Sequence, residues 1–360
     1  MKSSSCDFNQ ECSQDIDTIL FCGDTFLLTR DGSDPFEHVS QAMTNYVICI
    51  NLEASLKGKN VVDKAVAITV AEASLQSLPK NIWYVSIVNN HAADSTDPIE
   101  LCKALIRMGK RVIGPLNPSR LDDVVAGKTI SFFSAYLKLP RGRVSYRGRI
   151  INELFKMIRR SDADLRIVNL HWGYEHTDVP APFQITLAHK IVDAGANLII
   201  GHHPHVAQGW EIYNNTPIFY SLGNFNFGQF DSLPQENNCW GYMVSFDCKK
   251  NSGFPIPYKI NNNYQPYCMT EAEKETLNRK VETLSDKLKS VDIADWFLES
   301  YKKWFLHEMH VWKSDFLRER SLFIILKWGA WLMLPLQWCF YYYFIKNHAQ
   351  KNNGHWHKKI

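Results

Sequence analysis

The sequence contains no CxxC pair, and its nine cysteines are odd in number and irregularly spaced. We therefore expect neither a disulfide framework nor a thiolate metal site. Residues 1–16 are predicted to be a disordered N-terminus, since they are polar and lack the apolar run of a secretory signal. This absence predicts that the bulk of the protein stays on the cytoplasmic side.

Neither sign of charge dominates. The sequence has 40 Lys and Arg and 37 Asp and Glu, which gives a net charge of +3. We therefore expect no nucleic-acid partner. The sequence also has no GxxxxGK[ST] phosphate loop, no HExxH and no GxSxG, which excludes the corresponding classes of nucleotide-binding and hydrolytic site. With 45% hydrophobic and 21% charged residues, it has an ordinary globular composition.

Long hydrophobic runs are also scarce, and one segment, residues 322–345, stands out. It is interrupted by Lys327 and Gln337 and is long enough to span a bilayer as a helix. We predict that residues 321–346 are membrane-associated and that residues 347–360 form a basic tail. The alternative is an aromatic amphipathic helix that packs on the globular domain or lies flat on a membrane.

Residues 17–247 repeat a short apolar run, a polar cluster and a helix-like segment, which predicts an α/β domain. Several of the apolar runs are continuous, as in strands covered on both faces. Helices are expected over 98–109 and 182–194, each begun by a proline and followed by a glycine. The predicted strands are 18–22, 46–50, 83–88, 165–170, 197–200, 218–222 and 242–246.

The rest of the chain is predicted to form a linker and a helical extension. Residues 248–269 contain Pro255, Pro257 and three consecutive asparagines without periodicity, so we expect a linker there. Thr270 and Glu273 form a capping-box pattern that predicts the start of a helical extension over 270–320. An aromatic stripe after residue 293 is expected to dock this extension onto the α/β body.

Polar side chains follow nearly every predicted strand. Because the carboxyl ends of strands form the ligand crevice of an open α/β sheet, we expect these groups to converge. Carboxylate, imidazole and amide donors together suit Mn, Fe or Zn, bound as one or two ions. Such ions activate water, so hydrolysis is the expected reaction class. The groups that follow the predicted strands are Asp24, Glu53, Asn90, His91, His171, Glu175, His176, His202, His203, His205 and Asn224.

Each group has a structural alternative. Asp24 could be a turn or helix cap, and Asn90 belongs to an ordinary turn sequence. Glu175 and His176 could orient a ligand rather than bind the metal, and Asn224 could hydrogen-bond its own loop. A glycosidase-like pair made of Asp24 and Glu53 is also possible, but it leaves the histidines without a role.

At these residues the sequence resembles the CapA family of poly-gamma-glutamate capsule biosynthesis proteins, which share a fold with calcineurin-like metallophosphoesterases. The resemblance covers about residues 17–247 and implies a four-layer α/β sandwich with a metal site at the strand ends. Metallophosphoesterases usually begin with Asp-x-His, whereas Phe26 follows Asp24 here. The matching stretches are FCGDTFL (21–27), INLE (50–53), SIVNNHAAD (86–94), VNLHWGYEH (168–176), AHKIVDAGANLIIGHHPHVAQGWEIY (188–213) and PIFYSLGNFNFG (217–228).

The resemblance implies a metal-dependent hydrolase that acts on a phosphoester or an amide-linked anionic polymer during production of a capsule or another cell-envelope polymer. His171 or His203 would assist proton transfer. The metal ligands would be Asp24, Glu53, Asn90, His91 and His205, and the supporting or substrate-contacting residues would be Glu175, His176, His202 and Asn224.

The alternative is a non-catalytic, membrane-associated component of a polymer synthase or export complex. Polymer synthase subunits are then possible partners. In either case residues 322–345 would hold the protein at the membrane, with the catalytic domain on the cytoplasmic side.

Overall fold

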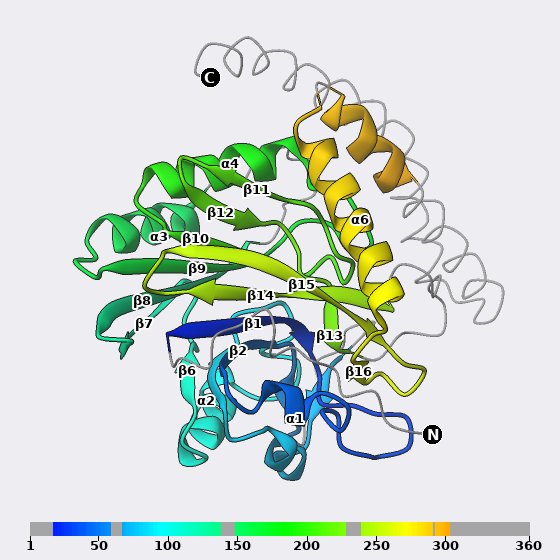
Figure 1. Cartoon of the computed structure of the whole chain (residues 1–360). Helices are drawn as coiled ribbons and strands as arrows, with labels where there is room; N and C mark the ends of the chain where they lie inside the picture. Colours follow the sequence, from blue (N-terminus) through cyan, green and yellow to red (C-terminus); the bar gives the residue numbers. More distant parts are fainter. Residues whose placement is uncertain (1–16, 59–66, 138–147, 228–238, 291, 303–360) are drawn as a thin grey trace, which may run out of the picture.

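The computed structural model describes residues 17–58, 67–137, 148–227, 239–290 and 292–302. Two β-sheets face each other, and helices cover their outer faces (Figure 1). In the larger sheet β1, β2, β5 and β6 are parallel, and β13 adds beside β1. Its strand order is β16-β15-β14-β1-β2-β5-β6, with bounds β1 Thr18–Thr25, β2 Val47–Leu52, β5 Ile82–Ser86, β6 Arg111–Ile113, β13 Asn224–Asn226, β14 Trp240–Asp247, β15 Ser252–Ile260 and β16 Pro266–Tyr267.

The second sheet has a parallel centre, β8, β9, β10 and β12, and antiparallel edges, β7 and β11. A separate small sheet joins β3 (Ser55–Leu56) to β4 (Thr69–Val70). The second sheet has the order β11-β12-β10-β9-β8-β7, with bounds β7 Ser119–Val125, β8 Lys128–Leu137, β9 Leu165–Trp172, β10 Leu198–His202, β11 Trp210–Tyr213 and β12 Thr216–Phe219.

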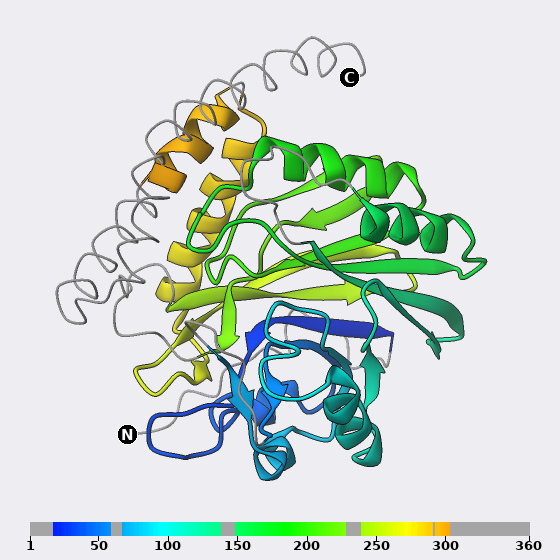
Figure 2. The same cartoon turned by 180° about the vertical axis from the view of Figure 1, so that it is seen from behind.

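Three hydrophobic clusters define four layers. Between the sheets, Phe21 and Cys49 of the larger sheet pack with Phe132 and Ile167 of the second. A second cluster packs α1 and α2 on the larger sheet, and a third packs α3 and α4 on the second sheet (Figures 1 and 2). The expected four-layer α/β sandwich is therefore confirmed. These helices are α1 Ser40–Met43, α2 Pro98–Arg107, α3 Arg149–Arg159 and α4 Pro182–Asp193, and a 3-10 helix, η2, covers Glu72–Ser77.

Burial on both faces explains the continuous apolar runs of the central strands. Every residue of β1 is buried, and Leu20 and Phe21 belong to clusters on opposite faces of the sheet. Because successive side chains of a strand point to opposite faces, a strand between two apolar layers needs apolar residues at every position. The runs predicted from the sequence thus correspond to β1, β2, β5, β9, β10, β12 and β14.

The expected linker over 248–269 is wrong, because β15 and β16 lie within it. β15 pairs with β14 over residues 252–259, whereas β16 pairs with β15 only at Lys259 and Ile260. Pro255 and Pro257 therefore lie where one side of β15 has no partner strand. A proline at such an edge position removes no ladder hydrogen bond. The sandwich consequently extends beyond residue 247, and β7, β8 and α3 are further elements that the sequence analysis did not predict.

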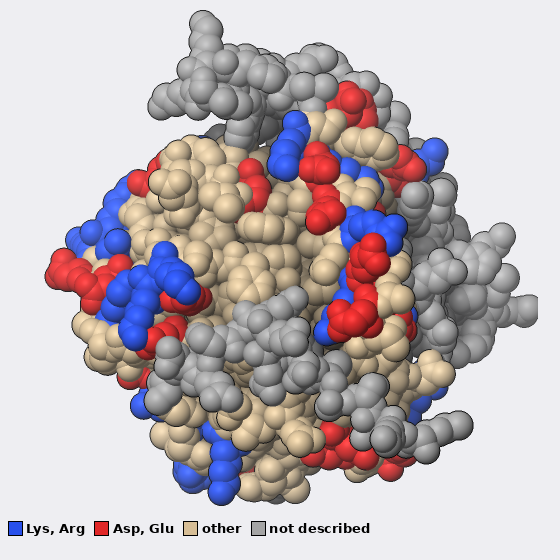
Figure 3. Space-filling model, viewed as in Figure 1, with Lys and Arg blue, Asp and Glu red and all other residues tan. Residues whose placement is uncertain are grey.

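The helical extension begins as predicted with α6 (Glu271–Leu288), and residues 293–302 form another helix. Leu277, Val281 and Leu284 of α6 complete the cluster between the sheets. Its exposed side carries intermixed charges, including the ion pairs Lys274–Glu271 and Arg279–Glu275 (Figure 3).

Residues 303–320, the apolar segment 322–345, the N-terminus and the basic tail lie outside the described residues. Membrane contact through 322–345 stays a prediction. In the part of the chain that the structure describes, none of the helices combines the length and apolarity of a bilayer-spanning segment.

We expect Thr270→Ala to lower the free energy of unfolding by about 1 kcal/mol. The Thr270 side chain accepts a hydrogen bond from the Glu273 N–H, and the Glu273 carboxylate accepts one from the Thr270 N–H at 3.0 Å. Equilibrium urea denaturation measures the change. The control is Thr276→Ala on the exposed side of α6, because that hydroxyl donates to the Ala272 carbonyl within its own helix and caps neither end. Equal losses in both variants would contradict the capping role.

Candidate metal centre

Asp24 lies at the end of β1, where a close backbone approach holds it. The Asp24 N–H donates to the Gly223 carbonyl at 3.0 Å. A Cβ on Gly23 would lie 2.1 Å from the same carbonyl oxygen, so this approach requires glycine. The Asp24 carboxylate accepts hydrogen bonds from the Asn51 side chain at 2.8 Å and from the His203 N–H at 3.1 Å.

Glu53 follows β2 and lies among three imidazoles. Its Oε1 atom is 3.8 Å from His91 Nε2, 3.4 Å from His171 Nε2 and 3.7 Å from His205 Nε2. These separations exceed normal N–H···O hydrogen-bond lengths. They resemble the spacing between donors that share one ion, because each bond of Zn²⁺ to nitrogen or oxygen is only about 2.0–2.2 Å long.

His171 is the next-to-last residue of β9, and it stands beside His202 of β10 in the parallel register. Its Nε2 atom is 2.5 Å from Asn90 Oδ1, and its Nδ1 atom is 3.4 Å from Asn51 Nδ2. His202 Nδ1 lies 3.2 Å from Asp24 Oδ1. The second sheet therefore supplies imidazoles to the carboxylates of the first sheet, as expected for convergence at the strand ends.

The segment after β10 adopts an uncommon backbone conformation. His203 and His205 have φ values of 97° and 58°, in a region that side chains other than glycine rarely occupy. The His205 ring nitrogen Nδ1 is 2.9 Å from Asn224 Oδ1 and 3.5 Å from Asp24 Oδ2. Such conformations persist where the surroundings hold them, often at functional sites.

His91 has a carboxylate partner that the sequence analysis missed. His91 Nδ1 lies 2.5 Å from Asp94 Oδ2, which also accepts a hydrogen bond from the Ile68 N–H at 2.8 Å. Asn89 accepts from the His91 N–H and donates to the Leu52 carbonyl. A carboxylate on one ring nitrogen orients the other toward a metal. The i, i+3 spacing in NHAAD was the available signal.

Burial and the neighbouring charges set opposite pKa shifts. Burial alone would raise the pKa of Asp24, but His202, with His205 and His171, outweighs it and holds the pKa well below its usual range. Burial lowers the pKa of His171 and brings that of His203 to about 3. Burial also opposes the charge on His205, but Glu53 and Asp24 more than compensate and raise its pKa. The site thus combines an ionised carboxylate, neutral imidazoles at His171 and His203, and an imidazole at His205 whose protonated form is favoured.

Two donor groups overlap at Glu53. Asp24, Glu53 and His171 form one group, Glu53, His203 and His205 form the other, and the donor atoms within each lie within 4.8 Å of one another. The buried His203 Nδ1 atom has no hydrogen-bond partner among the described residues. The donor set fits a divalent ion, since carboxylates and neutral imidazoles are ligands of Mn, Fe and Zn.

The structure therefore brings the five predicted metal ligands together with His171 and His203, the two histidines predicted to assist proton transfer. Asn90 contacts His171, and His91 faces Glu53. His171 and His203 lie among the donors instead of apart from them, so their assignment to proton transfer stays a prediction. Of the predicted supporting residues, His202 lies beside Asp24, Asn224 beside His205, and the His176 ring is 6.2 Å from that of His205. The charge of Glu175 reaches both His203 and His205.

Tyr136 is a further residue of the site that the sequence analysis missed. It pairs with His171 in the register of β8 and β9, and the two rings meet edge to face with centroids 5.7 Å apart. Burial, then the charges of Glu175 and Glu53, raise the pKa of Tyr136 to about 12. Its hydroxyl makes no hydrogen bond within the described part of the chain, so a protonated phenol is available beside the donors. Because β8 was not predicted, no pattern placed it there.

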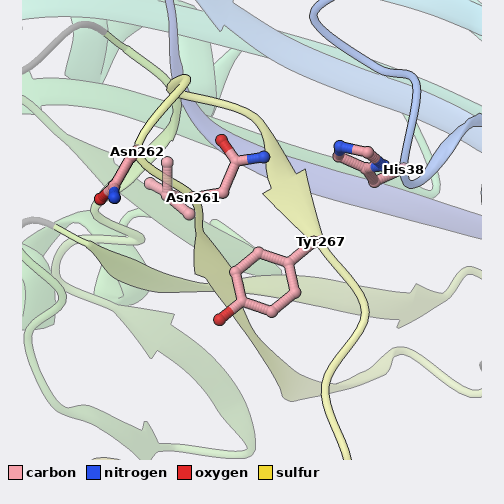
Figure 4. A pocket seen from close by; sticks show the side chains of 5 residues that line it. His38, Asn261, Asn262 and Tyr267 are labelled. Atoms are coloured by element: carbon pink, nitrogen blue, oxygen red, sulfur yellow. The ribbon is translucent and has the colours of Figure 1, made fainter.

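A surface hollow of about 530 Å³ lies elsewhere, lined by His38, Ile260, Asn261, Asn262 and Tyr267 (Figure 4). These residues come from the chain before α1 and from the β15–β16 hairpin. None of the predicted site residues lines this hollow, so it is separate from the metal donors. The chemistry of the donors, rather than the hollow, identifies the candidate site.

Comparison with known proteins relates one part of the chain to a family. Residues 127–229 match the family model described as "Bacterial capsule synthesis protein PGA_cap". The chain is 54% identical over 71 residues to the capsule biosynthesis protein CapA of Bacillus anthracis. This aligned stretch covers 20% of this chain and 17% of that protein. It is 44% identical over 92 residues to the PGA biosynthesis protein CapA of Bacillus subtilis, 26% of this chain and 23% of that protein.

Two solved structures are also similar. A hypothetical protein from Thermus thermophilus aligns with a TM-score of 0.46 at 18% identity, over 67% of this chain and 99% of that one. A novel phosphatase from Mycoplasma pneumoniae aligns with a TM-score of 0.44 at 17% identity, over 69% of this chain and 95% of that one.

The sequence matches cover less than a quarter of the length of the two Bacillus relatives. They confirm the CapA resemblance, and the chain is related through residues 127–229 to the bacterial capsule synthesis proteins.

Proposed function

We propose that this chain is a metal-dependent hydrolase that acts on a phosphoester or an amide-linked anionic polymer during capsule or cell-envelope polymer production. The observation that supports it is the pair of donor groups that share Glu53. The names of the Bacillus relatives support the link to capsule polymers. Carboxylates and imidazoles arranged around one shared carboxylate are suited to one or two divalent ions.

The metal, when bound, supplies a water of lowered pKa and polarises the scissile group. Asp24 and Glu53 would provide the negative charge that holds it, and Asn51 fixes the Asp24 carboxylate through a hydrogen bond. Asp94 orients His91 toward Glu53. We assign the proton transfer to His203, since its Nδ1 atom has no partner within the described residues.

Tyr136 is proposed to contact the substrate. Its protonated hydroxyl is a hydrogen-bond donor next to His171, and an anionic oxygen of a phosphoester or carboxylate is a matching acceptor. A donor aimed at developing negative charge lowers the barrier of hydrolysis.

We expect His205→Ala to lose most of its bound metal and its hydrolytic activity together, because it removes a donor of one group and a neighbour of both carboxylates. Elemental analysis of the purified protein and turnover of a chromogenic phosphodiester measure the two effects. His38→Ala is the control, since His38 is exposed and lies outside both donor groups. Full activity in His205→Ala would show that the ligand assignment is wrong. Bound metal in the wild type without turnover of any anionic substrate would favour the non-catalytic assembly role.

Divalent metal should raise the melting temperature of the wild type, because it binds the folded chain. At one hundred times its Kd the stabilisation is about 2.7 kcal/mol, or roughly 5 °C or more. Differential scanning fluorimetry with Mn²⁺ or Zn²⁺ after chelation measures it. Glu53→Gln should abolish the rise because both donor groups share Glu53, whereas Glu72→Gln, at an exposed pair with Arg107, should keep it. An undiminished rise in Glu53→Gln would rule out Glu53 as the shared ligand.

Tyr136→Phe should lower kcat/KM for the cleaved substrate by up to about tenfold, the effect of losing one hydrogen bond, and should leave the metal content unchanged. Steady-state kinetics and elemental analysis give the two values. Tyr267→Phe is the matched control, because that phenol lines the separate hollow. If both variants kept the wild-type kcat/KM, the hydroxyl of Tyr136 would have no role in the reaction.

A further inference from the structure

We propose that helix 293–302 is a positioning element of the metal centre, because it holds the loop of residues 173–178 in place beside the donors. The loop carries Glu175 and His176 between two points of attachment to the helical extension. The effect on catalysis rests on the proposed function, whereas the effect on the loop does not. Ser300 and Tyr301 are therefore positioning residues in this proposal, since neither is a member of the donor groups.

One side of the loop meets the metal centre. The His176 N–H donates to the Pro204 carbonyl at 2.7 Å, and its ring is 6.2 Å from the ring of His205. Glu175 acts electrostatically on His203 and His205. A displacement of the loop would therefore change both the charge at the donors and the support of the backbone between His203 and His205.

On its other side, the loop contacts the helical extension near both ends of the loop, at Tyr174 and at Asp178. The Tyr174 ring packs edge to face on Tyr301 with centroids 5.0 Å apart, and it contacts Phe297 at 5.7 Å. The Asp178 N–H donates to Ser300 Oγ at 3.0 Å, and the Asp178 carboxylate is 3.7 Å from Lys287 Nζ of α6. Glu175 and His176 lie between these two attachments.

The loop needs such support because its backbone is unusual. Gly173 and His176 both have positive φ, 94° and 58°, and a histidine in that region is held there by its surroundings. The sandwich also holds the loop, through the hydrogen bond from the buried Gln208 side chain to the Thr177 carbonyl at 2.7 Å and the edge-to-face contact of Tyr174 with Phe183 of α4 at 6.4 Å. Loss of the contacts from the extension would remove the aromatic contacts of Tyr174 with Phe297 and Tyr301 and the hydrogen bond of Asp178 to Ser300.

The donor group of Asp24, Glu53 and His171 does not depend on this loop. Asp24 and His171 belong to strands, and Glu53 directly follows β2. Loosening the extension should consequently leave metal binding intact while misplacing Glu175 and His176. Retained metal therefore distinguishes a positioning role from a general structural one. If the substitutions caused the whole site to collapse, the metal would be lost as well.

The test compares the full-length chain with the double variant Ser300→Ala/Tyr301→Leu. Hydrogen exchange followed by mass spectrometry reports on residues 173–178, and elemental analysis and steady-state kinetics report on the site. We expect exchange in this loop to accelerate about tenfold or more, given one hydrogen bond and one aromatic pair lost. Metal content should not change, and kcat should fall with little change in KM.

Two further variants make the comparison specific. Tyr301→Phe keeps the ring and should behave as the wild type, whereas Lys302→Ala changes an exposed neighbour on the same helix and should have no effect. If the double variant does not fold, Ser300→Ala alone removes the Asp178 hydrogen bond and is measured in the same way.

Unchanged exchange in residues 173–178 would overturn the proposal, as would faster exchange with an unchanged kcat or a parallel loss of metal. If the wild type hydrolyses nothing, the proposed function fails and the exchange rates alone decide: acceleration confined to the variants that lose the contacts supports the positioning of the loop, and its absence overturns it.

Discussion

The burial of two carboxylates, Asp24 and Glu53, is the constraint on which the site depends. Both side chains are 0% exposed, and an ionised group removed from water must be compensated by partners or by a cation. Asn51 and His202 compensate Asp24, and three imidazoles surround Glu53. The histidines of both sheets are therefore arranged around negative charge. The layers of the sandwich exclude water from this point and make each electrostatic contact stronger than it would be at the surface.

The sandwich architecture explains why these groups meet. β1 and β2 are parallel neighbours in one sheet, and β9 and β10 are parallel neighbours in the other, so each pair ends its strands at one edge. The family match over 127–229 covers the strands of the second sheet that supply the histidines, whereas Asp24 and Glu53 precede it. Neither part holds a complete donor group, since Glu53 is joined by His171 of β9 in one group and by His203 and His205, which follow β10, in the other. The folded sandwich, rather than either sequence segment, is the unit that could bind metal.

Sequence analysis predicted that these residues converge because it used features that the local chain dictates. Buried strands read as apolar runs, and the polar residues that end them must lie at one edge of a sheet. The partners of the donors were less accessible. Asp94 turns back onto His91 only in the observed loop conformation, and Tyr136 reaches His171 only through the pairing of β8 with β9. The strand β15 was missed because prolines in the sequence are typical of a linker. A strand tolerates proline only on a side that has no partner strand, and the sequence does not reveal which side of β15 that is.

The protonation pattern indicates what a metal would meet on entering the site. Asp24 stays ionised because the neighbouring histidines outweigh its burial, and His171 and His203 stay neutral because burial disfavours their charge. Their lone pairs are therefore available for coordination. His205 differs, since Glu53 and Asp24 favour its protonated form. A proton on His205 and a divalent ion held by Glu53 would neutralise the same two carboxylates, so an ion that His205 ligates would displace that proton. Among His171, His203 and His205, the residue whose protonated form is favoured is thus a member of the second donor group.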